Sequence, residues 1–461
     1  MQYTSPIDIK LNFIKKNLLN TFAKIRKWVT DNPIKSIIIV GTLVRLVVAF
    51  LYQYITLYPD SEGYVELAKR ILNFDFSGYE GQRSPGYPIL LALSNISYST
   101  TGALQFIIGI VTLIYFYKTC LSVRLSKKIS FYLTIILSCY LPTIFFEVTI
   151  LTETLTLLVI ILIFYLFFRI RSGQSNQYIG LSILCGYLVL IKPFYIFLPI
   201  ILFFILLNVS SFKSLLTRLS FIIIIPLFVF LGWSYVNKKN ADYFTSTTFY
   251  GFNLAQNCVN FAEKTTPEYA PIGNIYAKYR DNRISDKEIA MTIWEAYPEL
   301  ESETGLSFPD LSKRLYDYSI ATIKENPTAY LQQVFISWRD FWKTSLYWEY
   351  DKFAIPHANE ILLYICYLER ILLQLIKIAF IILIPYNIFR GIKQKKITPQ
   401  LTISIIVFTA SILQAFVTYG TNSRFSFPFE MLIVLSVILN VLDIRYKKLE
   451  RSDIQFESKQ P

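Results

Sequence analysis

Residues 151 to 169 read LTETLTLLVIILIFYLFFR, an apolar run whose only charged residues are Glu153 near its start and Arg169 at its end. This length is close to the about 20 residues that a helix needs to cross a bilayer. Similar runs recur near 36 to 56, 102 to 121, 129 to 146, 178 to 191, 194 to 209, 219 to 236, 371 to 389, 399 to 418 and 426 to 443. The sequence therefore predicts an all-α polytopic membrane protein of about 10 transmembrane helices.

The composition agrees with this class. Of the 461 residues, 54% are hydrophobic and only 17% are charged, against roughly 25% in soluble domains. The formal net charge is +13, but Lys and Arg lie in short clusters between the apolar runs, where they orient the spans. Nucleic acid is therefore not expected as a partner, whereas the lipid bilayer is.

The basic clusters also predict how the chain crosses the membrane. Cytoplasmic loops carry an excess of Lys and Arg, which puts both termini in the cytoplasm and the chain in the plasma (inner) membrane. The predicted segments are a basic amphipathic cytoplasmic segment at 1 to 35, a transmembrane module at 36 to 236 with a first outer loop at 57 to 101, an extracytoplasmic cap at 237 to 358, C-terminal transmembrane helices at 359 to 444 and a cytoplasmic tail at 445 to 461. Helical patterns near 311 to 325 and 327 to 343 predict a small, mainly helical cap.

The first outer loop carries polar groups next to apolar runs, with YPDSEGY at 58 to 64 and QRSPGYP at 82 to 88. Charged groups kept near the membrane usually face an aqueous cavity and often mark function. Asp60 is the first candidate, and its alternative is a helix N-cap. Arg83 offers a planar fork of donors that matches two phosphate oxygens, and its alternative is an arginine that snorkels to the interface.

Three further charged residues lie at predicted outer boundaries. Glu153 enters an apolar run, where an acid needs a partner. Lys192 and Arg424 would each hold an anionic head group at such a boundary, although Lys192 is equally well explained as a loop lysine.

The motif Asp60-Ser61-X-X-Tyr64, followed by Arg83-Ser84-Pro85-Gly86-Tyr87-Pro88, resembles the first-loop signature of the GT-C glycosyltransferases. The similar branch contains the protein O-mannosyltransferases and the lipid A aminoarabinose transferase. Weaker similarity comes from Leu151-Thr152-Glu153, Asn326-Pro327-X-X-Tyr330-Leu331 and Arg424-Phe425-X-X-Pro428. Two departures are Gly420-Thr421-Asn422, where the family often has an acid, and Lys192, where many relatives have arginine.

The resemblance implies that a sugar carried on a polyprenyl phosphate passes, with inversion, to a glycan, lipid or protein acceptor of the cell envelope. The module at 36 to 236 would then be catalytic. The implied catalytic residues are Asp60, Glu62 and Glu153, the residues that bind the donor phosphate are Arg83, Lys192 and Arg424, and the residues that support the motif are Tyr64, Pro85, Gly86 and Tyr87.

The role of the first acid stays open at this point. Asp60 would accept the proton of an acceptor hydroxyl, but it would only position substrate if the acceptor were itself a phosphate. No obligatory metal is expected, since the sequence has one histidine and no clustered set of hard ligands. The alternative is that Glu153 joins Asp60 around a divalent cation.

Two other classes of membrane protein fit the same pattern of spans. An O-antigen polymerase or ligase would use a diphosphate-linked donor and depend on arginines of the large outer segment instead of an acid in the first loop. A polytopic transporter or flippase would use the charged groups to carry ions or gate a path. Sugar transfer in detergent, where no compartments exist, distinguishes an enzyme from a transporter.

Overall fold

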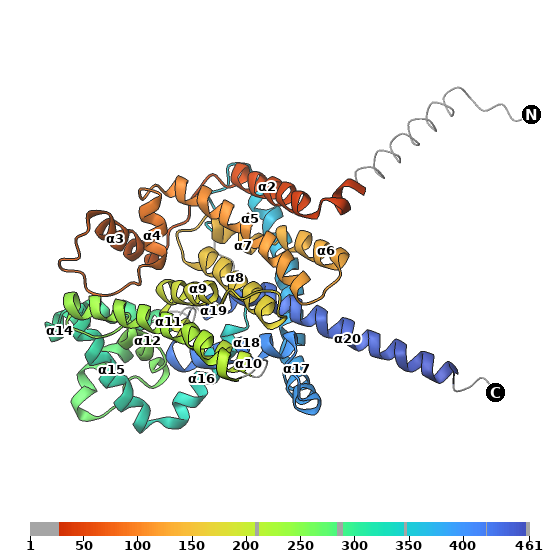
Figure 1. Ribbon diagram of the computed structural model, residues 1–461. Helices are drawn as coiled ribbons and strands as arrows, with labels where there is room; N and C mark the ends of the chain where they lie inside the picture. Colours follow the sequence, from red (N-terminus) through yellow and green to blue (C-terminus); the bar gives the residue numbers. More distant parts are fainter. Residues whose placement is uncertain (1–26, 208–211, 284–288, 345–347, 421, 458–461) are drawn as a thin grey trace, which may run out of the picture.

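The computed structural model describes residues 27–207, 212–283, 289–344, 348–420 and 422–457, with the side chains of 212–219 and 446–457 left out. Figure 1 shows a bundle of helices, from which the C-terminal part of α20 (Glu430–Glu457) extends on the right of the view. The described residues form helices and loops, and their only β contact is an isolated bridge between Thr56 and Thr149. The predicted all-α class is confirmed. The predicted amphipathic segment at 1 to 35 lies mostly outside the described residues.

Seven helical segments of the described chain are long and apolar enough to cross a membrane. They lie in α2 (Pro33–Leu51), α5 (Tyr98–Ser122), α8 (Glu153–Arg171), α11 (Phe212–Ala241), α17 (Ala358–Gln394), α18 (Pro399–Val417) and the segment Ser423–Arg445, which contains α19 (Ser423–Ser426), η5 (Phe427–Phe429) and the start of α20 (Glu430–Glu457). The chain is therefore a polytopic membrane protein, as predicted.

The predicted span near 129 to 146 is broken in the structure. It consists of α6 (Lys127–Ser138) and α7 (Leu141–Glu147), which meet at an angle of 59° and make an eighth span if counted together. Pro142 lies at the start of α7, where its missing N–H and fixed ring prevent a continuous helix. The total of about 10 is reached only if the two shorter apolar stretches also cross, namely α9 (Tyr178–Ile191) and η1 (Pro193–Ile196) with α10 (Phe197–Leu207).

The helix predicted near 371 to 389 begins earlier than expected. It starts at Ala358, because the residues from Ile361 to Leu368 already continue the apolar pattern before Glu369 and Arg370 interrupt it. The predicted boundary of the cap at 358 therefore coincides with the start of α17.

The segment between α11 and α17 has a hydrophobic core of its own. The ring of Phe252 stacks on Trp294 at 4.5 Å and on Phe308 at 4.9 Å between centroids. Its helices are α12 (Tyr250–Gln256), η2 (Val259–Phe261), η3 (Pro267–Tyr269), α13 (Ala270–Asp281), η4 (Ile289–Met291), α14 (Thr292–Thr304), α15 (Phe308–Glu325) and α16 (Pro327–Phe341). The two helices predicted near 311 to 325 and 327 to 343 are confirmed by α15 and α16.

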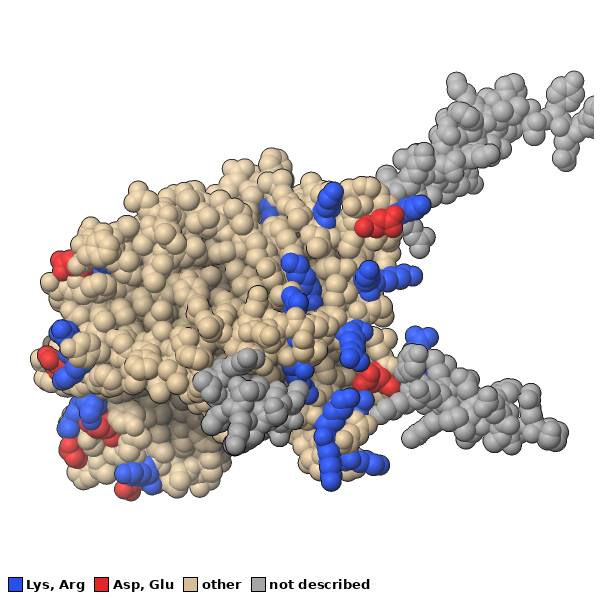
Figure 2. All heavy atoms as spheres, viewed as in Figure 1, with Lys and Arg blue, Asp and Glu red and all other residues tan. Residues whose placement is uncertain are grey.

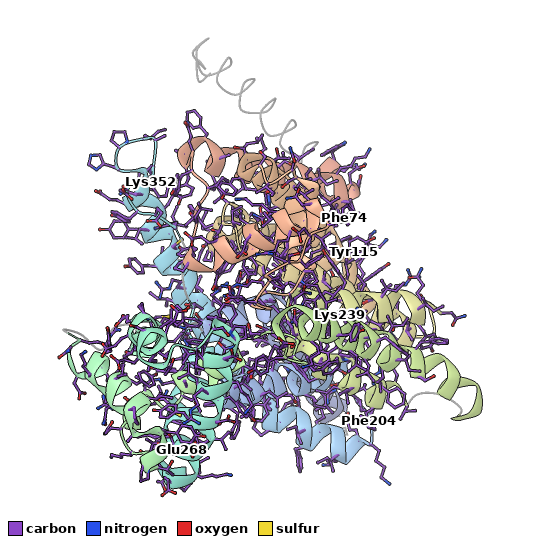
Figure 3. All side chains as sticks on the ribbon, turned by 90° about the vertical axis from the view of Figure 1, so that its left-hand side faces the viewer. Phe74, Tyr115, Phe204, Lys239, Glu268 and Lys352 are labelled. Atoms are coloured by element: carbon purple, nitrogen blue, oxygen red, sulfur yellow. The ribbon has the colours of Figure 1, made fainter. Side chains whose placement is uncertain are left out.

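The first outer loop contains α3 (Pro59–Asn73) and α4 (Gly86–Leu93). A capping box begins α3, in which the backbone N–H of Tyr58 donates to Oγ of Ser61 over 2.9 Å. Asp60 is the second residue of the helix, so its interpretation as the N-cap is wrong. Figure 3 shows Phe74, just after α3, and Glu268, in η3, on opposite sides of that view.

Charged side chains are distributed unevenly over the visible surface. In Figure 2, Lys and Arg form bands on the right of the view, near the parts of α6, α17 and α20 that Figure 1 places there, whereas the left end carries both signs. A predominantly basic end is what the positive-inside pattern predicts for the cytoplasmic side. The orientation in the membrane stays a prediction.

Candidate functional site

A continuous chain of ion pairs joins five of the predicted site residues. Nη2 of Arg83 donates to Oδ1 of Asp60 over 2.8 Å, and Nη1 of Arg424 donates to Oδ2 of the same carboxylate over 2.7 Å. Nε of Arg424 donates to Oε1 of Glu153 over 2.7 Å, and Nζ of Lys192 reaches the same oxygen at 3.1 Å. We call these five residues the ionic network.

Five separate parts of the chain supply the ionic network. Asp60 lies in the first turn of α3 and Arg83 lies in the loop before α4. Glu153 is the first residue of α8, Lys192 follows the last residue of α9, and Arg424 lies in α19. All five therefore lie at ends of helices or in short connections, where they interrupt no span.

The charges of the network do not cancel. Three cationic and two anionic side chains give a net charge of +1. Burial alone would raise the pKa of Asp60, but the guanidinium groups of Arg83 and Arg424 outweigh it and hold the pKa well below the usual range of a carboxyl. Asp60 is the most accessible member, with 34% of its side chain exposed, whereas Glu153 is fully buried. The network therefore carries a net positive charge, and its most exposed group is the Asp60 carboxylate.

Aromatic rings hold the guanidinium of Arg83. Its Cζ lies 4.8 Å from the ring centre of Tyr64 and 4.4 Å from that of Phe249. Its backbone N–H donates to the hydroxyl of Tyr79 over 2.7 Å. The interpretation of Arg83 as a snorkelling side chain is therefore wrong, since it points into the molecule. Its Nε is buried and has no hydrogen-bond partner among the described residues.

Gly86, in the predicted motif at 82 to 88, lies where the backbone of α9 leaves no room for a side chain. A Cβ atom at this position would lie 2.5 Å from the backbone N of Ile191 and 2.6 Å from the carbonyl carbon of Leu190. The absence of a side chain lets α4 pack directly on the end of α9, one residue before Lys192. The hydroxyl of Tyr187 donates to the Gly86 carbonyl over 2.9 Å, and Pro85 precedes the first turn of α4.

Tyr87 and Tyr64 connect this turn to the rest of the site. Their rings meet edge to face at 5.3 Å between centroids. Burial raises the pKa of Tyr64 to about 12, so its hydroxyl is neutral at physiological pH. The hydroxyl of Tyr87 donates to Oε1 of Gln105 over 3.0 Å.

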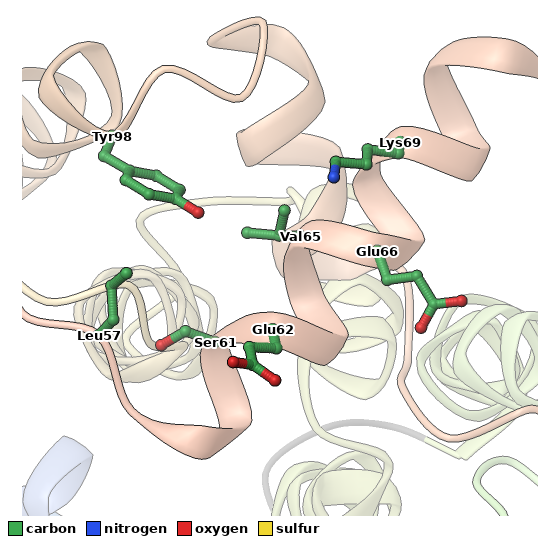
Figure 4. Close-up of a pocket in the computed structure, with 7 residues that line it drawn as sticks. All are labelled: Leu57, Ser61, Glu62, Val65, Glu66, Lys69 and Tyr98. Atoms are coloured by element: carbon green, nitrogen blue, oxygen red, sulfur yellow. The ribbon is translucent and has the colours of Figure 1, made fainter.

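Glu62 is not part of the ionic network. It lines a separate pocket of about 270 Å³ between α3 and the start of α5, with Leu57, Ser61, Val65, Glu66, Lys69 and Tyr98. Figure 4 shows the carboxylates of Glu62 and Glu66 on α3 and the ring of Tyr98 across the pocket. The structure therefore separates Glu62 from Asp60 and Glu153.

No group of three or more His, Cys, Asp or Glu side chains in the described part of the chain is arranged to hold a metal ion. Between Asp60 and Glu153 lies the guanidinium of Arg424, which donates to both carboxylates. A cation shared by the two acids would have to displace this guanidinium.

Sequence reasoning missed two aromatic contacts of the site, those that Phe249 and Tyr79 make with Arg83. Phe249 comes from the segment after α11, which meets the first loop where the backbone N–H of Thr248 donates to the carbonyl of Gly81 over 2.9 Å. The chain contains 37 phenylalanines and 33 tyrosines, so no local signal distinguished these two.

The fold and the network define an all-α polytopic membrane protein with a buried, net positive cluster at the ends of its helices. No family model and no curated protein matches the sequence. Among solved structures, the chain is similar to the Archaeoglobus fulgidus oligosaccharyltransferase tethered to an acceptor peptide, with a TM-score of 0.47 at 12% identity, over 92% of this chain and 51% of that chain. The chain thus spans about half the length of that protein.

Proposed function

We propose that the chain is a membrane glycosyltransferase of the GT-C type. It transfers a sugar from a polyprenyl-phosphate donor to an acceptor of the cell envelope on the extracytoplasmic face, with inversion at the anomeric carbon. The observation that carries the proposal is the ionic network, which gathers the residues of the first-loop motif, Asp60 and Arg83, with Arg424 of the last-loop motif.

The net positive charge of the network suits the leaving group. When the bond between the anomeric carbon and the phosphate oxygen breaks, the electron pair stays on the lipid phosphate, which gains negative charge. Fixed cations in a site with little water stabilise such charge far better than water does. Arg83, Arg424 and Lys192 are the groups that would receive it.

The acceptor hydroxyl forms the new bond to the anomeric carbon, and its proton needs an acceptor. Asp60 is a poor base while two guanidinium groups bind it, because the same contacts that lower its pKa lower its affinity for a proton. A donor phosphate that takes over hydrogen bonds from Arg83 or Arg424 would weaken those contacts. Asp60 would then gain basicity only when the donor is bound.

If the acceptor is itself a phosphate, no proton is removed. Asp60 would then serve to hold the guanidinium groups of Arg83 and Arg424 in place until the donor arrives. Glu153 has the corresponding role for Arg424 and Lys192, since its Oε1 accepts from both.

The test uses the purified chain in detergent with radiolabelled sugars carried on polyprenyl phosphate or, in a separate reaction, on polyprenyl diphosphate, and an envelope extract as the source of acceptor. Wild type is compared with Arg83→Ala and Asp60→Asn. Arg339→Ala is the matched control, because 59% of the Arg339 side chain is exposed and its partner Asp340 is its neighbour in sequence. A thermal melt shows that each variant is folded.

Transfer by wild type and by Arg339→Ala, with loss of about 100-fold or more in Arg83→Ala, would support the enzyme and the site. Loss in Arg83→Ala but not in Asp60→Asn would support a phosphate acceptor. Transfer from diphosphate-linked donors alone would contradict the proposed donor, and wild type inactive with every donor would contradict the enzymatic function.

A further inference from the structure

We propose that the buried ion pair between Arg45 and Glu147 is a positioning device that aligns three members of the ionic network, namely Asp60, Arg83 and Glu153. This inference rests on the proposed function. The pair lies outside the ionic network and touches none of its residues, so it would act through the short segment from Glu147 to Thr152 that leads into Glu153.

The pair itself is rigid and closed to water. Nε of Arg45 donates to Oε2 of Glu147 over 2.7 Å, and Nη2 donates to Oε1 over 2.5 Å. The third donor, Nη1, reaches the carbonyl of Gly41 at 3.1 Å. The side chains are 3% and 0% exposed. A bidentate pair of this kind fixes orientation as well as distance, and here it ties the end of α7 to α2.

The backbone of the segment after Glu147 forms hydrogen bonds with the residues around Asp60. The backbone N–H of Ile150 donates to the carbonyl of Thr56 over 3.1 Å, and the Thr56 N–H donates to Val148 over 2.9 Å. Oγ of Ser61, next to Asp60, donates to the Ile150 carbonyl over 2.8 Å. The first turn of α3 is therefore held by this segment.

The same segment is connected to the surroundings of Arg83 through the amide side chain of Gln105. Nε2 of Gln105 donates to the carbonyl of Glu147 over 2.8 Å and to that of Thr149 over 3.0 Å. Oε1 of Gln105 accepts from Tyr87, whose ring packs on Tyr64 beneath the Arg83 guanidinium. Glu153 is connected to the segment directly, because it follows Thr152 in the chain. A displacement of Glu147 would therefore also displace Asp60, Arg83 and Glu153.

The ion pair packs directly against the backbone of α5 at Gly109. A Cβ atom there would overlap Oε1 of Glu147 and lie 2.5 Å from Nη2 of Arg45. Both atoms are fixed by their bond to each other, so neither can move aside without breaking it. Gly109→Ala therefore disturbs the pair by one methyl group, without removing a charge or touching the ionic network.

The experiment measures kcat and donor KM of Gly109→Ala in the transfer assay. The matched control is Gly232→Ala, a glycine of α11 whose added Cβ would meet nothing within 4 Å. We expect kcat to fall at least tenfold in Gly109→Ala, with donor KM changed less than threefold and unchanged values in Gly232→Ala. A merely structural role would lower the yield of folded protein and leave kcat per folded molecule at the wild-type value, which would overturn the proposal.

A second variant keeps the test decisive if Gly109→Ala fails to fold. The double variant Arg45→Met/Glu147→Leu removes both charges together, and replacing a buried pair by apolar groups is often neutral for stability. We expect it to fold and to lose kcat, because the apolar pair no longer fixes the orientation of the segment. A folded double variant with wild-type kcat contradicts the positioning role, whereas an inactive wild type would contradict the proposed function instead.

Discussion

Arg424 donates from Nη1 to Oδ2 of Asp60 over 2.7 Å, although 364 residues separate the two in the sequence. The same guanidinium donates from Nε to Glu153. Arg424 is thus the only member of the ionic network that binds both acids, and it links α19 to the first outer loop and to α8. The two halves of the network depend on the shape of one side chain.

Replacement of Arg424 by lysine is expected to abolish this bridge while keeping the charge. An ammonium group has no planar fork and cannot match the two carboxylates in the same way. We expect Arg424→Lys to reduce kcat/KM for sugar transfer by about 100-fold or more, as is typical when one stabilising donor is lost from an active site. Steady-state assays with the radiolabelled donor measure this.

The control for this prediction is Arg339→Lys, at an exposed arginine. Its kcat/KM should equal that of wild type. Retention of more than about a third of wild-type kcat/KM in Arg424→Lys would show that the charge alone is sufficient.

The lowered pKa of Asp60 predicts how transfer depends on pH. Because the folded pKa is below the unfolded value of about 3.9, ionised Asp60 stabilises the fold above that value, and this stabilisation is lost as pH falls through the folded pKa. Asp60 therefore contributes no inflection to kcat/KM of wild type between about pH 5 and 8. In Arg83→Gln a cation is removed while burial, which raises the pKa, remains, so Asp60 should protonate at a higher pH than in wild type.

The profile of kcat/KM against pH tests this, with Arg339→Gln as the control. Where transfer by Arg83→Gln is too slow to measure, the pH of acid unfolding gives the same comparison and should be higher in Arg83→Gln than in wild type. An equal or lower unfolding pH would contradict the electrostatic role of Arg83.

The sequence singled out the members of the ionic network, but not the way in which they are arranged. The motif around Asp60 and Arg83 indicated a related pair, and the structure brings them together over a separation of 23 residues. The contact between Glu153 and Arg424 spans 271 residues, and no local pattern encodes such a distance. The interpretation of Asp60 as an N-cap failed because the helix begins at Pro59, so that Tyr58 is the N-cap residue.

For the fold, too, some features could be predicted from the sequence and others could not. Apolar runs identified most spans, because length and hydropathy are local properties. The 59° bend between α6 and α7 was missed, since the hydropathy pattern continues across Pro142. The place of Glu62 was also missed, because residues of one short helix turn point to different sides and the sequence did not say which side faces the site.

Gly86→Ala is expected to separate α4 from α9. The added methyl group would meet the backbone at Leu190 and Ile191 at 2.5 to 2.7 Å, and backbone atoms inside a helix cannot rotate away. We expect a loss of stability of about 1 to 3 kcal/mol, as for other overpacked sites, and a loss of transfer because Lys192 moves with the end of α9. Thermal melts and transfer assays measure the two effects.

Gly180→Ala is the control, because its added Cβ would lie at ordinary contact distances of 3.6 Å or more from its neighbours. It should melt like wild type. Equal melting temperatures for the two variants would mean that α4 and α9 adjust without cost.

Metal chelation is expected to leave transfer unchanged. The reason is the place of Arg424, whose guanidinium already balances the two carboxylates that a divalent cation would bridge. Transfer measured in excess EDTA should stay within about twofold of the untreated value, a change of less than 0.5 kcal/mol in the barrier. Loss of transfer with EDTA, restored by Mg²⁺ or Mn²⁺, would assign Asp60 or Glu153 to a metal.

The last prediction concerns Lys377 of α17, which pairs with Glu430 at 2.8 Å and is fully buried. Its Nζ also donates to Oγ of Ser426, two residues after Arg424, over 3.0 Å. Lys377→Met leaves the Glu430 carboxylate buried without its partner, which should cost about 3 to 5 kcal/mol and lower the melting temperature. Lys377→Met/Glu430→Leu removes both charges and should recover most of that loss. If the double variant melts as low as the single one, the stability comes from the hydrogen bonds that Lys377 donates to Ser426 of α19 and to the Lys343 carbonyl after α16, and not from its pairing with the charge of Glu430.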